Sequence, residues 1–352
     1  MQNHALSDAQ AIEVRRLFPI SFNPCFVCVA YRKPKPDNNK SRPPSPQGNK
    51  SLCSTRSSSS SSKAIRRAGS VVPHRKVSTI DCTKAPCSAQ SWTVTSARTG
   101  RLLFSSGEDD MREIASLTKI TTCYIALLLA QDYGLSAHTL IPVSAKAAGV
   151  AGTTAELETG DRVRFGDLLY GLMLPSGNDA AQALAEYFGA LIACKKGYVT
   201  MTKKLDRLFI REMNQLANSL SLRRTSYQNP HGLSIKKNFS TARDVGTLAV
   251  AAMRFPGFRE LVNTRTHTCV ISNKKQPDRT VTWENTNKLL LLPGFDGVKT
   301  GVTEAAGPCL CASVRKGEVR LVLTVLGARS MEERWVEVPR LAAWAFAHLE
   351  SH

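Results

Sequence analysis

The hydrophobic and polar positions of the chain change their period several times after residue 89, and each period predicts an element. Two short apolar runs, residues 92–97 and 102–106, flank the polar stretch 98–101 and predict a β-hairpin. From Ser116 to Gln131 the apolar positions recur every three or four residues, which predicts a helix.

Helical spacing continues through the middle of the chain. Residues 165–188 predict two helices that are broken at 174–177, where a proline and a glycine force a turn. We expect Asn178 and Asp179 to cap the second of these helices, because short polar side chains accept from its free N–H groups.

Two more helices follow, at residues 205–220 and 241–255. In the second of them, Thr241 and Asp244 have the spacing of a capping box, with aspartate in place of the usual glutamate.

The period changes to two after residue 294, which indicates strands rather than helices. The pattern predicts three strands and a closing helix, at residues 298–302, 308–314, 319–327 and 331–349. Strands at both ends with helices between them predict an α+β fold, in which an antiparallel sheet flanked by helices carries an inserted, mainly helical region. We assign residues 89–352 to this single unit.

The first quarter of the chain differs from the rest in composition. Residues 1–88 hold 15 lysines and arginines against four acidic residues, so they carry over half of the net charge of +19. They are rich in serine and proline and poor in large apolar residues, which predicts a disordered extension. Such a basic, acid-poor segment is also typical of targeting peptides. The protein would then act outside the cytoplasm or in an organelle; an untargeted tail or an imprecise start site are the alternatives.

Charge, hydropathy and cysteine spacing exclude several functions. The region after residue 88 is only mildly basic and has no basic stripe with interleaved aromatic residues, so no nucleic-acid partner is expected. No stretch reaches the roughly 20 apolar residues of a membrane span. Cys25-x-x-Cys28 lacks a second pair of ligands at zinc-finger spacing, so we expect no metal site, and buried free thiols among the later cysteines.

Three short motifs carry the candidate chemistry: Ser116-Leu117-Thr118-Lys119, Ser176-Gly177-Asn178 and Lys299-Thr300-Gly301. None of them is specific alone. The spacing S-x-x-K, for example, occurs five times, from Ser60, Ser116, Ser234, Ser272 and Ser313. The element predicted around each motif, and the occurrence of all three together, single them out.

Ser116 and Lys119 lie three residues apart on a predicted helix and therefore share a face. A serine hydroxyl needs an adjacent base to become a nucleophile. Lysine can serve if burial or a neighbouring cation lowers its pKa, and Lys299 could be that cation. An N-cap serine with an exposed lysine is the alternative for an isolated motif.

The other two motifs supply groups for proton transfer and binding. The turn at Ser176 could direct its hydroxyl toward the leaving group, while Asn178 could hold Lys119 and a substrate amide. Lys299 and Thr300 on a strand suit a carboxylate, and Gly301 allows a substrate backbone to approach closely.

The set resembles the signature of penicillin-recognising serine enzymes. The surrounding segments 115–120, 175–181, 229–233, 240–244 and 296–301 are similar to those of D-alanyl-D-alanine carboxypeptidases, and the resemblance covers about residues 90–350. It implies a peptidase that removes the terminal D-alanine from peptidoglycan stem peptides and is acylated by β-lactams, without a cofactor.

The resemblance also implies residue roles. Ser116 would be the acylated nucleophile and Lys119 its base, with Ser176 and Asn178 as the second catalytic element. Substrate would be bound by Lys299, Thr300, Gly301, Val302 and Arg334. The backbone N–H groups of Ser116 and Val302 would form the oxyanion hole, and Arg334 would assist with the carboxylate.

Two departures from the family are visible. The family usually continues with a small β-rich domain and a C-terminal amphipathic helix, whereas this sequence ends at His352. Residues 190–208 look like a longer and more basic link than is usual, which could alter substrate access.

Two other functions stay open. A class A β-lactamase would share the three motifs, but it needs a glutamate in an E-x-x-L-N context, and Glu212-Met213-Asn214 fails that spacing. A binding protein that has lost turnover is the non-enzyme alternative. The oligomeric state is not predicted, and His231, in an Asn-Pro-His-Gly turn, is expected to be structural.

Overall fold

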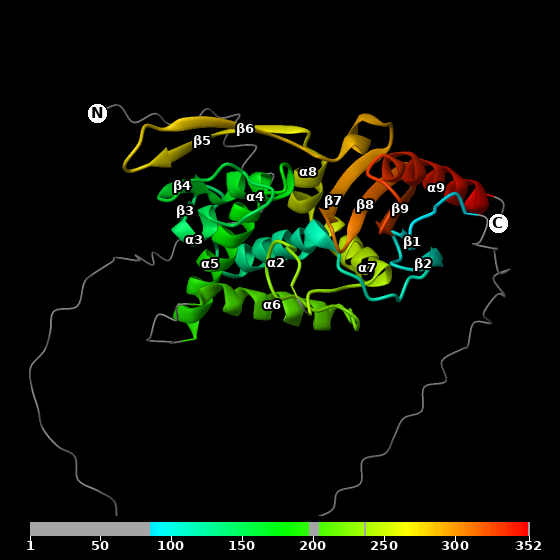
Figure 1. Ribbon diagram of the computed structural model, residues 1–352, viewed down its shortest axis with the longest axis horizontal. Helices are drawn as coiled ribbons and strands as arrows, with labels where there is room; N and C mark the ends of the chain where they lie inside the picture. The colour runs from blue at the N-terminus through cyan, green and yellow to red at the C-terminus, as the bar shows by residue number, and fades with distance from the viewer. Residues whose placement is uncertain (1–84, 197–203, 236, 351–352) are drawn as a thin grey trace, which may run out of the picture. The chain divides into compact units, whose positions relative to one another are not determined.

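The computed structural model describes residues 85–196, 204–235 and 237–350 (Figure 1). The disorder and targeting predicted for residues 1–88 therefore fall almost entirely outside the described residues and stay predictions. Among the described helices, none has the length and apolar character needed to cross a membrane.

A five-stranded antiparallel sheet joins the two ends of the described chain, in the order β2-β1-β9-β8-β7. Its strands are β1 (Ser91–Ser96), β2 (Leu102–Ser106), β7 (Phe295–Thr303), β8 (Gly307–Lys316) and β9 (Val319–Leu326). The predicted hairpin and the three predicted strands are all confirmed. Because β1 pairs with β9, residues more than 200 positions apart in the sequence lie side by side.

The sheet is covered on both faces. Leu310 and Ala312 of β8 pack with Trp92 and helix α9 (Glu333–Glu350). Cys309 and Cys311, which alternate with them, are buried free thiols in the other core, together with α7 (Ala242–Met253). Strands buried on both faces read as continuous apolar runs, and this explains why β8 and β9 are recognisable in the sequence.

The inserted region between β2 and β7 is mainly helical, as predicted. It comprises η2 (Ala115–Leu117), α2 (Thr118–Asp132), α3 (Ala145–Ala148), α4 (Phe165–Met173), α5 (Asn178–Lys195), α6 (Leu205–Ser219), α8 (Pro256–Asn263) and η3 (Lys288–Leu291), besides α7. The expected link at 190–208 is partly wrong, because α5 continues to Lys195 and α6 begins at Leu205, while residues 197–203 lie outside the described part.

The structure adds a second antiparallel sheet that the sequence pattern did not predict. It has the order β3-β4-β5-β6 and consists of β3 (Leu140–Pro142), β4 (Asp161–Arg164), β5 (Thr266–Asn273) and β6 (Arg279–Glu284). β3 and β4 are too short to show a period. They depend on tertiary contacts such as the ion pair of Asp161 with Arg279, at 2.6 Å.

Candidate active site

Ser116 and Lys119 lie at the junction of η2 and α2. Ala115 has a φ of 47°, and the chain then turns through η2 into the long helix. The Nζ atom of Lys119 lies 2.8 Å from the Oγ of Ser116. The shared helical face expected from their spacing is therefore present, with Ser116 partly exposed and Lys119 fully buried.

The amine of Lys119 has two further partners, both of them oxygens. It lies 2.6 Å from Oδ1 of Asn178 and 2.9 Å from the carbonyl oxygen of His231. Burial and the nearby Lys299 lower the pKa of Lys119 well below its usual value, against an opposing effect of Asp179. A neutral amine is accessible at this position for that reason.

The turn between α4 and α5 carries the second motif. Ser176 has a φ of 68° and is 4% exposed, and its Oγ has no hydrogen-bond partner among the described residues. Asp179 accepts from the first-turn N–H of Ala180, at 2.8 Å, as expected. The N-cap of α5 is Gly177, with no side-chain capping bond, so the expected capping by Asn178 is wrong. Asn178 instead binds Lys119 through Oδ1 and the carbonyl of Ala151 through Nδ2, at 2.7 Å.

The carboxylate of Asp179 holds this turn through hydrogen bonds to the preceding loop, a role that the sequence pattern did not indicate. Its carboxylate accepts from the hydroxyl of Thr154 and from the N–H groups of Ala155 and Leu157, at 2.6 to 3.1 Å. The loop before β4 is thereby tied to the start of α5. The capping box expected at α7 is present only in its first half: Thr241 accepts from the N–H of Asp244, as predicted.

Strand β7, at the edge of the main sheet, supplies the third motif. Lys299 is 1% exposed, and burial and the charge of Arg334 lower its pKa to about 7. Thr300 is 8% exposed, and its hydroxyl lies 2.8 Å from that of Thr286. Val302, by contrast, is 50% exposed.

Gly301 marks the contact between β7 and the motif at Ser116. A Cβ at Gly301 would lie 3.0 Å from the backbone N of Ser116 and 3.1 Å from the carbonyl oxygen of Ile114. This backbone contact by itself gives a structural reason for a glycine at position 301, independent of any substrate. The expected approach of a substrate along the strand stays a prediction.

Arg334 reaches the backbone of the sheet from α9. It is 4% exposed, and one guanidinium nitrogen donates to the carbonyls of Gly301 and Cys309, both at 3.2 Å. Its guanidinium also lies over the ring of Trp335. These contacts hold the end of β7 and supply the charge that acts on Lys299.

His231 contributes to the site through its backbone, which sequence reasoning did not foresee. Its carbonyl binds Lys119, while burial, and the charge of Lys119 in its protonated form, lower the pKa of its ring to about 3. The following Gly232 has a φ of 90°, and a Cβ there would clash with the carbonyl of Ala115. The turn is therefore packed directly against the start of η2, in line with the structural role expected for His231.

A partly exposed serine beside a buried lysine, an asparagine and a lysine-bearing edge strand match the signature residues of the class of penicillin-recognising serine enzymes. The family model described as D-alanyl-D-alanine carboxypeptidase, peptidase S11, matches residues 78–330. The chain belongs to this family.

Curated relatives carry the same name. The D-alanyl-D-alanine carboxypeptidase of Streptomyces sp. (strain K15) is 34% identical over 71% of this chain and 84% of its own length. DacF of Bacillus subtilis (strain 168) is 30% identical over 75% of this chain and 64% of its own. DacC of Escherichia coli (strain K12) is 32% identical, and 62% of it is covered. The chain thus spans slightly less than two thirds of the last two relatives.

Solved structures share the architecture. The crystal structure of the Streptomyces K15 DD-transpeptidase has a TM-score of 0.68 at 32% identity, and the match covers 74% of this chain and 98% of that one. DacD of Francisella tularensis has a TM-score of 0.64 at 28% identity, with 76% and 72% covered. The expected fold class is confirmed by these similarities.

Proposed function

We propose that this protein is a serine-type D-alanyl-D-alanine carboxypeptidase that acts on peptidoglycan stem peptides through an acyl-serine intermediate. The observation that carries the proposal is the position of the Lys119 amine, buried and 2.8 Å from the hydroxyl oxygen of Ser116. Family membership supports the reaction and the substrate class.

The protonation state of Lys119 decides the direction of this hydrogen bond, because the charged ammonium donates to Ser116 Oγ. A neutral lysine amine has two N–H groups and one lone pair. Two of its partners, Oδ1 of Asn178 and the carbonyl of His231, can only accept. The two N–H groups are used there, so the lone pair is left for the hydroxyl proton of Ser116, and this makes Lys119 the general base.

Acylation would proceed as follows. Ser116 Oγ attacks the carbonyl carbon of the penultimate D-alanine, and its proton passes to Lys119. The backbone N–H groups of Ser116 and Val302 stabilise the oxyanion, a type of contact that contributes about 3–4 kcal/mol in serine hydrolases. The C–N bond then breaks, and the proton returns to the amine of the departing D-alanine through Lys119 and Ser176.

Ser176 is suited to that relay, because its buried hydroxyl has no partner among the described residues and is free to bond a reacting group. Lys299 and Thr300 would bind the terminal carboxylate of the substrate. Arg334 would act through Lys299 and the backbone of Gly301, given that its guanidinium bonds to that backbone.

Water would then attack the acyl-enzyme and regenerate the serine. The name of the Streptomyces K15 structure, a DD-transpeptidase, supports an amine as an alternative acceptor for the same intermediate. A β-lactam, whose ring amide resembles the scissile bond, would acylate Ser116 and remain attached. The absence of a nucleic-acid partner, the lack of a cofactor and the targeting role of residues 1–88 remain predictions.

Against a β-lactamase stands the environment of the nearest candidate glutamate. Glu212 forms an ion pair with Lys196, at 3.4 Å, and Asn214 two residues later binds the backbone of Tyr227. Both residues lie on helix α6, and neither has a hydrogen bond or ion pair with Ser116 among the described residues.

Intact mass spectrometry after incubation with benzylpenicillin tests the proposal. We expect one stable adduct on the wild type and none on Ser116→Ala. Ser234→Ala is the matched control, since Ser234 begins another S-x-x-K spacing but is exposed and bonded to Glu113. Release of D-alanine from a diacylated D-Ala-D-Ala peptide should follow the same pattern. An adduct that survives in Ser116→Ala, or no adduct on the wild type, would contradict the assignment.

A further inference from the structure

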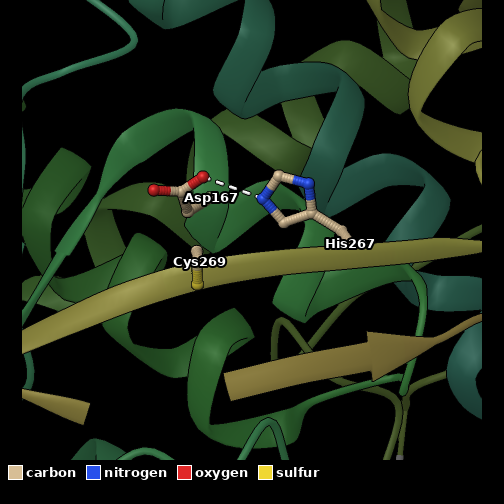
Figure 2. A group of neighbouring side chains, drawn as sticks. All are labelled: Asp167, His267 and Cys269. Carbon is tan, nitrogen blue, oxygen red and sulfur yellow. Dashed lines mark hydrogen bonds and ion pairs between the residues drawn. The ribbon is translucent and has the colours of Figure 1, made fainter. Parts of the chain in front are cut away.

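A second group of reactive side chains lies away from the serine site, between α4 and β5. It consists of Asp167, His267 and Cys269 (Figure 2). One ligand atom from each residue lies within 4.8 Å of the other two, and Nε2 of His267 is 2.8 Å from Oδ1 of Asp167. A carboxylate, an imidazole and a thiol thus lie close enough together to form a candidate metal site.

The backbone explains why they meet. His267 and Cys269 are two residues apart on β5 and therefore project from the same face of the strand. The burial of β5 alternates, with the face that bears these two residues more covered than the opposite one. Asp167 occupies the first turn of α4, against which this face lies.

The site is shielded without being closed. Cys269 is 7% exposed, whereas the side chains of His267 and Asp167 are 23% and 18% exposed. A small ion can reach such a position and still keep a solvent molecule. Three protein ligands and one water form a frequent coordination set for zinc.

The imidazole is held in orientation by two aromatic rings. Tyr170 stacks on His267 with 3.8 Å between the ring centroids and 13° between the planes, and Trp283 lies parallel on the other strand at 6.2 Å. Trp283 is itself fixed, because its indole N–H donates to the carbonyl of Ala155. The nitrogen that faces Asp167 is therefore preorganised, as supporting residues of metal sites require.

We propose that Asp167, His267 and Cys269 bind one zinc ion, which ties strand β5 to helix α4. Zinc ligand distances of about 2.0–2.3 Å place tetrahedral ligand atoms about 3.3–3.7 Å apart. The nitrogen of His267 and the oxygen of Asp167, at 2.8 Å, would therefore separate slightly, while any pair farther apart, up to 4.8 Å, would approach. The set of sulfur, nitrogen and oxygen donors suits zinc and disfavours magnesium or calcium, which prefer oxygen alone. On binding, the thiol proton of Cys269 passes to solvent. Nε2 of His267 gives up the proton that it donates to Asp167, the neutral imidazole carries its proton on Nδ1, and two bonds to the metal replace the hydrogen bond between His267 and Asp167.

The position gives the ion a structural role. Helix α4 leads directly into the turn that bears Ser176, and Trp283 bonds to Ala155, which in turn donates to Asp179. The metal would therefore stiffen the support of that turn without touching the substrate. Asp167 lies 100 residues before His267 in the sequence, so no motif spacing could have indicated the three ligands together.

The test is a metal titration of the full chain after removal of metals with a chelator. Zinc chloride is added in competition with a chromophoric chelator, and cobalt(II) is used in a parallel titration to detect a thiolate-to-metal absorption band. We expect one equivalent bound by the wild type, a higher Tm in its presence, and a loss of affinity of more than about 100-fold in Cys269→Ser and in His267→Ala.

The controls separate this site from other thiols and from misfolding. The double variant Cys25→Ser/Cys28→Ser removes the single C-x-x-C pair, and Cys194→Ser removes an exposed thiol; both should keep the bound equivalent. Cys269→Ser should unfold cooperatively without metal, and zinc should no longer raise its Tm. Equal affinity in Cys269→Ser and the wild type would overturn the proposal. So would a wild type without a stoichiometric site, which would leave only the hydrogen bond of His267 with Asp167 beside a buried thiol.

Discussion

Gly301 and Ser116 lie in backbone contact, since a Cβ at Gly301 would come within 3.0 Å of the amide nitrogen of Ser116. The contact joins the edge strand of the main sheet to the short helix that bears the candidate nucleophile. A methyl group at Gly301 would require one of the two segments to shift by a few tenths of an ångström. The two N–H groups proposed for the oxyanion hole belong to Ser116 and to Val302, the neighbour of Gly301, so this contact sets their separation.

Gly301→Ala is therefore expected to impair acylation more than folding. The new methyl group meets backbone atoms, which cannot rotate away, and overpacking of this kind costs about 1–3 kcal/mol of stability. The displaced donors should lower the rate of benzylpenicillin acylation by roughly 10²–10³, the effect of losing an oxyanion donor.

Gly166→Ala is the matched control for that variant. Its Cβ would make ordinary contacts, 3.4 Å from the Cβ of Ala137, within helix α4. This variant should acylate normally and be as stable as the wild type, or slightly more stable. Normal acylation by Gly301→Ala would show that the contact has no influence on the site.

The activity should pass through a maximum as pH is varied. Lys119 acts as a base only when neutral, so kcat/KM should fall as pH drops through its pKa, which burial and Lys299 lower well below the usual value. Lys299 binds the substrate carboxylate only when protonated, so kcat/KM should fall again above its pKa of about 7 in the free enzyme.

A bound carboxylate favours the charged form of Lys299, and so the alkaline limb of kcat should lie at higher pH than that of kcat/KM. The measurement is D-alanine release from a D-Ala-D-Ala peptide across the pH range. An alkaline limb at the same pH in both profiles would argue against Lys299 as the carboxylate partner.

Arg334→Met should move the alkaline limb. Burial lowers the pKa of Lys299 most, and the charge of Arg334 lowers it further. Without that charge the pKa of Lys299 rises, and the fall of kcat/KM should shift to higher pH, together with a lower maximum because two backbone carbonyls lose their donor. Arg340→Met, on the exposed side of the same helix, should leave the profile unchanged. An alkaline limb that stays at the same pH in Arg334→Met would show that the charge of Arg334 does not lower the pKa of Lys299.

Lys299→Met should abolish substrate binding and stabilise the protein near neutral pH. The pKa of Lys299 falls from 10.5 to about 7 on folding, because burial disfavours the cation. The unfolded chain then binds the proton more tightly. Burial of the charged lysine therefore destabilises the folded state. This destabilisation has its full size below pH 7, decreases as pH rises, and vanishes above the pKa of Lys299 in the unfolded chain. The gain at pH 7 should be about 1–4 kcal/mol.

Urea unfolding at pH 7 and at pH 10 measures this effect. The difference in unfolding free energy between Lys299→Met and the wild type should be smaller at pH 10. A variant that is less stable than the wild type at pH 7, or a difference that grows with pH, would mean that the lysine is not destabilised by burial.

The sequence predicted those parts of the fold that local contacts determine. The hairpin of β1 and β2, the helix after Ser116, the broken pair α4 and α5 and the strands β7 to β9 follow from patterns within about 20 residues. The second sheet was missed because β3 and β4 have three and four residues, and their pairing partners come from distant segments. The capping expected of Asn178 was wrong because its side chain binds Lys119, a contact that no local rule contains.

By itself, then, the sequence determined which chemical groups exist and which elements carry them: a serine and a lysine on one helical turn, a polar turn and a basic strand. The tertiary structure alone decided that these groups meet. It also decided that backbone atoms pack tightly against Gly301 and Gly232 and that Asp167, His267 and Cys269 converge. The physical reason is burial: the desolvation that lowers the pKa values of Lys119 and Lys299 arises only when segments up to 180 residues apart exclude water together.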